Sequence, residues 1–313
     1  MFQRTILTTA LLSGLAGLAS AADHDNRSPY DPNVEDLTPQ NEPPMLGIHW
    51  SKEMHGAQIR LARRSANMTY HGGKILPTAT TKAIFRGTSW ASYTGDKITG
   101  IDAWYTGFSG SHYAATVTEY TGTGGSSGSS PTTHQGHYVD VGAETSKGST
   151  SVVLAQVCSA LTASGTVIDA NGNGYYAMYS DQPRGNAGYC AYHSAGTCNG
   201  KAIQFAFFWK LDGDAGCDPA DTSGQHSQGL AALANVSGHE LAEAMTDPAS
   251  PGAWYDGSGA ENGDKCAWTF GAPLVQFTNG TWWKIQGEWS NAAFTAGTGY
   301  ANSSGQKGCL TGG

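Results

Sequence analysis

The segment HSQGLAALANVSGHELAEAMT, residues 226–246, contains the clearest helix of this sequence. Its apolar residues recur at helical spacing and fall on one face: Leu230, Ala234, Leu241 and Met245. His239 and Glu243 lie on the opposite side, and Glu240 is turned toward a flank. Because Pro248 follows closely, the helix should end before it. We therefore predict a helix that packs its apolar stripe on the core and turns its polar side chains toward a cleft.

The segments around this helix predict an α+β fold. A second helix is expected at 148–165, where apolar residues again share one face. Strand patterns occupy 74–76, 82–85, 174–181 and 201–211, and the last of these suits the centre of a sheet. A short helix or strand is expected around 113–120, and 121–134 is one of several long Gly/Ser-rich loops. We expect a mixed or antiparallel sheet with a few helices.

The N-terminal residues predict secretion. Arg4, an apolar run over 6–18 and small residues at 19–21 form the pattern of a signal peptide cleaved after Ala21. Residues 22–66 are rich in proline and acidic residues, so we expect an extended pro-segment or linker. The pair Arg63-Arg64 is either a cleavage site for a propeptide or a solvated basic turn. Residues 67–313 then form a single globular domain of an extracellular, monomeric protein.

The composition excludes two classes of partner. The formal net charge is −8, and only 17 residues are lysine or arginine. Binding to nucleic acid or to an anionic membrane surface needs clustered basic residues, so we expect neither partner. After the signal peptide no stretch approaches the ~18 consecutive apolar residues of a membrane span.

Six cysteines in an exported chain predict up to three disulfides. They are Cys158, Cys190, Cys198, Cys217, Cys266 and Cys309. Cys190 with Cys198 is the pair we favour first, because the short loop between them holds the two sulfurs close. Cys266 with Cys309 would tie the C-terminus to the rest of the fold. The chain has no C-x-x-C spacing, which argues against a cysteine-based zinc site.

The helix carries a variant of a zinc motif. In H-E-x-x-H enzymes, two ligands one helical turn apart bind the same ion, and the glutamate after the first ligand polarises the bound water. Here His239 and Glu243 have the ligand spacing and Glu240 has the position of the base. A carboxylate is an accepted zinc ligand, although its added charge also makes calcium possible. The opposing interpretation is a chance match on a polar helix face.

A third ligand should follow the helix, in DPASPGAWYDGSGAENGDKCAW, residues 247–268. We favour Glu261, with Asp264 orienting a ligand from outside the first shell. Asp247, nearly on the face of His239, is a rival. His193, in the loop CAYHSAGTC, is another and would supply a second imidazole. Separately, Trp282, Trp283 and Trp289 could line a groove for a cell-wall glycan, or they could pack in the core.

Several of these motifs resemble one family. MTYHGGKIL, KAIFRGTSW, CAYHSAGTC and HELAEAMTDP followed by AWYD are similar to secreted proteins of the phosphate-induced (EXORDIUM-like) group and its microbial relatives. The resemblance covers most of 68–310 and implies secretion and a single domain without implying catalysis. This sequence differs from the plant members in its full H-E-x-x-E and in ENGDKCAW.

The residues together predict a secreted zinc-dependent metallopeptidase of divergent zincin type, acting on an extracellular protein or peptide. Glu240 would be the catalytic base, and His239, Glu243 and Glu261 would bind the metal. The other interpretations are a non-catalytic secreted or cell-wall protein with a structural calcium site, or a carbohydrate-binding module.

Overall fold

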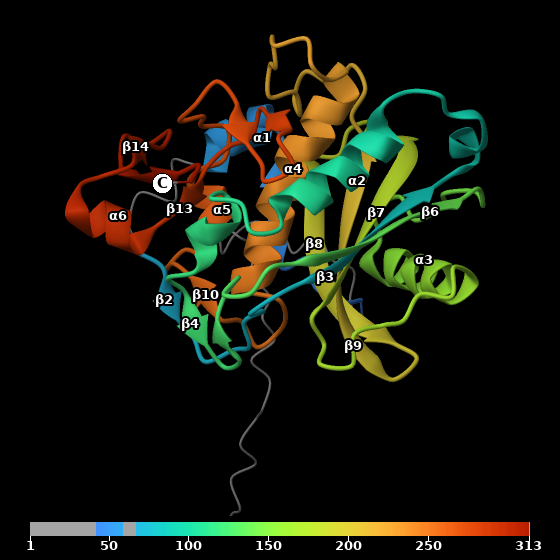
Figure 1. Ribbon diagram of the computed structural model, residues 1–313, viewed down its shortest axis with the longest axis horizontal. Coiled ribbons are helices and arrows are strands. Elements are labelled where there is room, and N and C mark those ends of the chain that lie inside the picture. Colours follow the sequence, from blue (N-terminus) through green and yellow to red (C-terminus); the bar gives the residue numbers. More distant parts are fainter. Residues whose placement is uncertain (1–41, 59–66, 313) are drawn as a thin grey trace, which may run out of the picture.

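The computed structural model describes residues 42–58 and 67–312, and its centre is one six-stranded sheet (Figure 1). The strands follow the order β1-β8-β9-β7-β3-β6. Their bounds are Gly47–Trp50 (β1), Tyr189–Cys198 (β8), Lys201–Lys210 (β9), Gly174–Pro183 (β7), Thr80–Arg86 (β3) and Thr133–Asp140 (β6). Strands β9, β7, β3 and β6 run parallel, β8 runs antiparallel to β9, and the edge strand β1 runs antiparallel to β8. The sheet is therefore mixed, which confirms the predicted α+β class.

The central strands are the ones with continuous apolar and aromatic sequences. Such runs suit strands that are covered on both faces, whereas alternating sequences suit half-exposed strands. In β7 the buried stretch covers eight consecutive residues, and in β9 it covers seven. The strands expected at 174–181, 201–211 and 82–85 are confirmed as β7, β9 and part of β3.

The strand expected at 74–76 is wrong. Lys74 forms only an isolated bridge with Thr123, and the amide of Leu76 donates to the carbonyl of Met245 at the end of a helix. The side chain of Leu76 is fully buried. The apolar run therefore belongs to an irregular segment that packs in the core beside the end of a helix. A sequence pattern does not distinguish such a segment from a short strand.

The helices cover both faces of the sheet. Their bounds are Lys52–Gln58 (α1), Lys97–Phe108 (α2), Thr150–Ala163 (α3), Gln228–Thr246 (α4), Asn262–Lys265 (α5) and Asn291–Ala296 (α6), with 3-10 turns at Thr88–Ser92 and Ala114–Val117. Figure 1 shows α2 and α4 on one side of the sheet and α3 on the other. The helices expected at 148–165 and 226–246 are confirmed, and the 113–120 region contains a 3-10 turn.

Helix α4 is the central helix of the molecule. The Ser227 hydroxyl caps its start by accepting from the amide of Leu230 at 3.2 Å, and the helix ends before Asp247-Pro248. Every residue from Gly229 to its end is buried. The prediction that its polar side chains face a cleft is therefore wrong. A helix with polar residues on one face can be buried on every face when polar groups of neighbouring segments contact those residues.

Short strands build the remainder of the fold around α4. They are Thr69–Tyr70 (β2), Thr121–Gly122 (β4), Gly125–Ser126 (β5), Trp254–Tyr255 (β10), Val275–Gln276 (β11), Trp282–Trp283 (β12), Glu288–Trp289 (β13), Tyr300–Ala301 (β14) and Lys307–Leu310 (β15). The side chains of Trp283 and Trp289 are almost fully buried, whereas Trp282 is 40 % exposed. Two of the three tryptophans thus pack in the core, so the three do not form a glycan groove.

Three disulfides join Cys158 to Cys198, Cys190 to Cys217 and Cys266 to Cys309. The Cys266–Cys309 pairing is confirmed, but the Cys190–Cys198 pairing is wrong. Those two cysteines lie at opposite ends of β8, and an extended strand of that length separates them by roughly 26 Å at ~3.3 Å per residue. The segment between them is a strand rather than a loop. Three disulfides are typical of an oxidising compartment.

Part of the segment 22–66 belongs to the folded core. Strand β1 pairs with β8, with Gly47 opposite His193 and His49 opposite Ala191, and α1 follows it. The expectation of an extended pro-segment does not hold for these residues, because their apolar side chains, such as Trp50, are buried. The signal peptide and the Arg63-Arg64 pair lie outside the described residues. Within the described ranges, no helix combines the length and apolarity needed to cross a membrane.

Candidate metal centre

Helix α4 brings its three motif residues together in the interior. His239 Nε2 lies 3.1 Å from Glu243 Oε1, one helical turn along, and both side chains are fully buried. Glu240 is also fully buried, and its Oε1 accepts from the amide of His49 in β1 at 3.2 Å. The three side chains offer atoms that all lie within 4.8 Å of one another. The i, i+4 spacing of the motif therefore produces the proximity that it predicts.

Strand β8 adds a second histidine to this cluster. His193 Nε2 lies 3.8 Å from Glu243 Oε2 and 3.6 Å from Glu261 Oε2, and all three side chains are fully buried. These separations are close to the roughly 3.4 Å between neighbouring ligand atoms around one tetrahedral zinc ion. His193, Glu243 and Glu261 thus form a second group whose ligand atoms lie within 4.8 Å of one another. Glu243 belongs to both groups, with one oxygen toward each histidine.

The short helix α5 positions Glu261. Glu261 is the residue before its first turn and Asp264 lies three residues later, where Asp264 Oδ2 accepts from the Glu261 amide at 3.0 Å. The amide of Asp264 in turn donates to Glu243 Oε1 at 3.0 Å, which joins α5 to α4. Asp264 Oδ1 also lies 3.7 Å from His239 Nε2. Asp247 accepts from the amide of Ala253 and belongs to neither group.

Gln286 determines the hydrogen position on His239. Its Nε2 donates to the carbonyl of Gly263 at 2.9 Å and lies 3.0 Å from His239 Nδ1. Because a carbonyl only accepts, the amide nitrogen faces the imidazole, and Nδ1 must accept. The His239 pKa is lowered by burial to about 3, so the ring is neutral and carries its one hydrogen on Nε2. That nitrogen lies 3.1 Å from Glu243 Oε1 without forming a hydrogen bond to it, and a protonated Nε2 cannot bind a cation.

Backbone fits tightly around the cluster at two glycines. A Cβ on Gly47 would lie 2.5 Å from His193 Nε2 and would also overlap Glu243 Oε2. A Cβ on Gly263 would lie 2.7 Å from His239 Nδ1. Strand β1 and helix α5 therefore approach the histidines as closely as glycine alone allows.

The residues that the motif missed are those that come from distant parts of the chain. Gly47 and His49 come from β1, and Gln286 follows β12. His49 Nε2 donates to Gln286 Oε1 at 2.9 Å, and its ring contacts that of His239 edge to face with 4.4 Å between centroids. No local spacing in the sequence connects these positions to the helix. Only the tertiary fold brings them to it.

The buried histidines predict that the protein loses stability in acid. Burial lowers the pKa of His49 well below its usual value, and it lowers the pKa of His55 to about 4. The unfolded chain takes up protons on these rings below about pH 6.5, whereas the folded protein does not. Stability should therefore rise with pH between about 4 and 6.5, by up to about 1.4 kcal/mol per pH unit for each histidine.

Urea unfolding of the metal-depleted protein at a series of pH values measures this dependence. His55→Gln removes one titrating ring outside the cluster and should reduce the slope. An unchanged slope in that variant would contradict the assignment of this acid sensitivity to His55.

Comparison of the chain with protein-family models, with curated proteins and with solved structures finds no match. The resemblance to the EXORDIUM-like group therefore stays a hypothesis.

Proposed function

We propose that the protein is a secreted zinc-dependent peptidase of divergent zincin type, with its ion held by His193, Glu243 and Glu261. The observation that carries the proposal is the convergence of one imidazole nitrogen and two carboxylate oxygens, each within 3.8 Å of the His193 nitrogen, beside a further buried glutamate. Zinc in such a site polarises a carbonyl and activates water. His239 takes a positioning role in this proposal, which differs from the role that the motif predicts.

The donor set favours zinc over calcium. Calcium takes six to eight oxygen ligands, whereas zinc takes four ligands drawn from nitrogen, oxygen and sulfur. His193 supplies a nitrogen at the point where the two carboxylates meet. Three protein ligands also leave one position of a tetrahedral ion for water or substrate, as in catalytic zinc sites.

Glu240 has the properties of a general base. Burial and the neighbouring charge of Glu243 raise its pKa well above the usual value for a glutamate. A carboxylate with a raised pKa is a stronger base than an ordinary glutamate. Its Oε2 has no hydrogen-bond partner among the described residues, which is costly for a purely structural side chain. This oxygen is available to take a proton from a nucleophilic water.

A structural metal centre is the second candidate. His193, His239, Glu240, Glu243 and Glu261 are all fully buried, and a peptide must reach the site before it can be cleaved. A closed metal site of this kind would stabilise the junction of β8, α4 and α5 without catalysis.

Metal analysis with an activity assay separates the candidates. The mature protein, purified without a histidine tag, should carry about one zinc per chain by plasma mass spectrometry and cleave an unfolded protein substrate. Glu240→Gln should keep the zinc and lose roughly 10²–10⁴-fold in the rate of cleavage. Glu119→Gln changes an exposed glutamate and is the matched control. Bound zinc without cleavage in the wild type would leave the structural role, and absence of any metal would refute both.

A further inference from the structure

A second candidate site lies on the opposite face of the sheet from the metal centre. It is a cavity of about 850 Å³, within the range of ligand pockets. Tyr189 and Trp209 line it, and the ring of Tyr189 packs with that of Tyr192 in the same aromatic layer. Successive residues of a strand face opposite sides of a sheet, so His193, next to Tyr192, faces the metal centre instead. The extra residue of β8 between the pairs His49–Ala191 and Trp50–Tyr189 lets Tyr189 share the face of Tyr192. The cavity and the metal centre are therefore separate sites.

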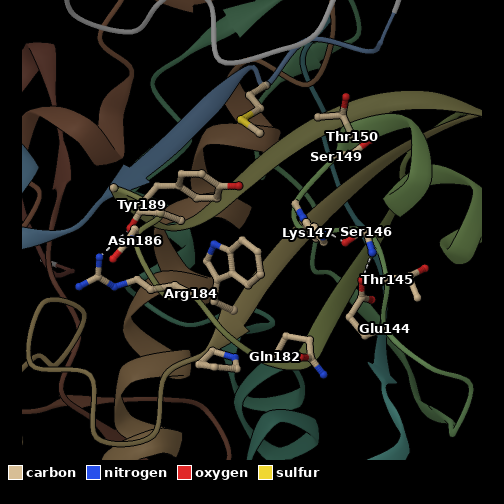
Figure 2. A pocket seen from close by; sticks show the side chains of 16 residues that line it. Glu144, Thr145, Ser146, Lys147, Ser149, Thr150, Gln182, Arg184, Asn186 and Tyr189 are labelled. Atoms are coloured by element: carbon tan, nitrogen blue, oxygen red, sulfur yellow. Dashed lines mark hydrogen bonds between the residues drawn. The ribbon is translucent and has the colours of Figure 1, made fainter.

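The cavity occupies a place where α/β sheets bind ligands. Its walls are the segment 144–150, which follows β6 and begins α3, and the segment 182–188, which contains the end of β7 and the loop after it. Both segments leave the carboxyl ends of parallel strands, where crevices in such sheets form. In Figure 2, Glu144 and Lys147 lie on one side of the cavity, and Arg184, Asn186 and Tyr189 lie on the other.

The walls of the cavity are fixed by internal hydrogen bonds. Arg184 forms two bonds to Asp214, at 2.5 and 2.9 Å, and its Nη1 donates to the carbonyl of Ala187 at 2.6 Å. On the opposite wall, Glu144 Oε1 accepts from the amide of Ser146 at 2.5 Å. A site whose side chains are held before a ligand arrives loses less entropy on binding.

One buried acceptor in this cavity has no partner. Glu144 is only 8 % exposed, and its Oε2 makes no hydrogen bond with any described residue. An acceptor left in this state costs free energy unless a ligand or water donates to it. The occupant should therefore bring a hydrogen-bond donor such as a hydroxyl group to Glu144.

The remaining lining indicates a neutral, polyhydroxylated occupant. Arg184 is paired with both Asp214 and Glu53, and Glu42 accepts from Ser149 and Thr150 on the wall, so the described lining of the cavity has no unpaired guanidinium and disfavours an anion. The rings of Tyr189 and Trp209, with centroids 6.0 Å apart, are 7 % and 6 % exposed and form an apolar floor beneath Gly148. Amides and hydroxyls on the rim both donate and accept: Thr145, Ser146, Gln182 and Asn186. An apolar floor beside mixed donors and acceptors matches the apolar face and the hydroxyl edges of a sugar ring.

We infer that this cavity binds a neutral carbohydrate, with Glu144 accepting from a sugar hydroxyl and Tyr189 and Trp209 packing on the sugar ring. The inference is independent of the metal centre, so binding should persist when the protein is treated with a chelator.

Titration calorimetry and saturation-transfer NMR with cellotetraose, chitotetraose and maltotetraose test the inference. At least one of them should bind to the wild type. Glu144→Gln keeps the shape of the side chain but removes its charge, and it should weaken binding at least roughly tenfold, as expected for a charge-assisted hydrogen bond. Asn186→Ala, on the exposed rim, should also weaken binding.

Trp282→Ala is the matched control, because Trp282 is an exposed tryptophan outside the cavity. It should bind as the wild type does. Thermal melting of each variant shows whether it is folded. The inference is overturned if none of the three sugars binds, or if binding survives both Glu144→Gln and Asn186→Ala.

Discussion

Replacement of His193 by alanine is expected to remove the zinc from the protein, whereas replacement of His239 should leave zinc bound with lower affinity. His193 offers a nitrogen 3.6 Å from Glu261 Oε2 and 3.8 Å from Glu243 Oε2, so it completes the proposed ligand set. His239 Nε2 lies 3.1 Å from Glu243 Oε1 without a hydrogen bond, so in our proposal it holds Glu243 in place by contact. Loss of an orienting partner typically weakens a metal site by about 10–100-fold, and loss of one of three ligands should cost more.

Competition with a chelator of known affinity measures both variants on one scale. His71→Ala, an exposed histidine, controls for the loss of an imidazole outside the cluster. Because either variant could also disturb packing, ¹⁵N NMR of the wild type provides a second test, and it should show His239 protonated on Nε2. Zinc lost with His239→Ala but retained with His193→Ala would contradict this assignment and restore the ligand set that the motif predicts.

A methyl group added at Gly47 is expected to weaken metal binding strongly without altering any ligand. The Cβ of an alanine at this position would overlap Glu243 Oε2 and lie 2.5 Å from His193 Nε2. Both atoms belong to side chains that are fully buried, so they cannot move into solvent. Displacement of β1 from β8 or of the two ligands should reduce zinc affinity at least as much as His239→Ala does, and should lower the melting temperature.

Gly56→Ala is the matched control for this substitution. Gly56 lies in α1, also near the N-terminus, and a Cβ there would meet no atom within 4 Å. Alanine favours a helix over glycine by roughly 1 kcal/mol, so this control should be neutral or stabilising. Normal zinc content in Gly47→Ala would contradict this prediction, because it would mean that the added methyl group does not displace His193 or Glu243.

Sequence patterns predicted the elements whose signal is local. The helix 226–246 has a continuous apolar stripe and a proline after its end, and the strand 201–211 is an unbroken apolar run. Glu261 was placed near the site because it follows the helix closely. For Cys190 the same local reasoning failed, because proximity along the chain suggested a loop where the chain is an extended strand.

The remainder of the site depends on contacts between distant segments. Gly47 and His193 are 146 residues apart in the sequence. The Gly47 backbone nevertheless lies against His193, because β1 pairs with β8. Gln286 fixes the hydrogen on His239 across 47 residues of sequence. Neither position has a motif of its own. The burial of the whole circumference of α4 was also not predictable, since it depends on where other polar groups lie.

Strand β1 has a consequence for handling the protein as shorter fragments. It is the edge strand beside β8, and it belongs to the first part of the described chain. A fragment that begins at residue 67 would expose the backbone N–H and C=O groups of β8 along a strand that is mostly buried in the intact fold. Unpaired edges of this kind join to one another, so such a fragment should aggregate unless a peptide covering 42–58 is supplied to it.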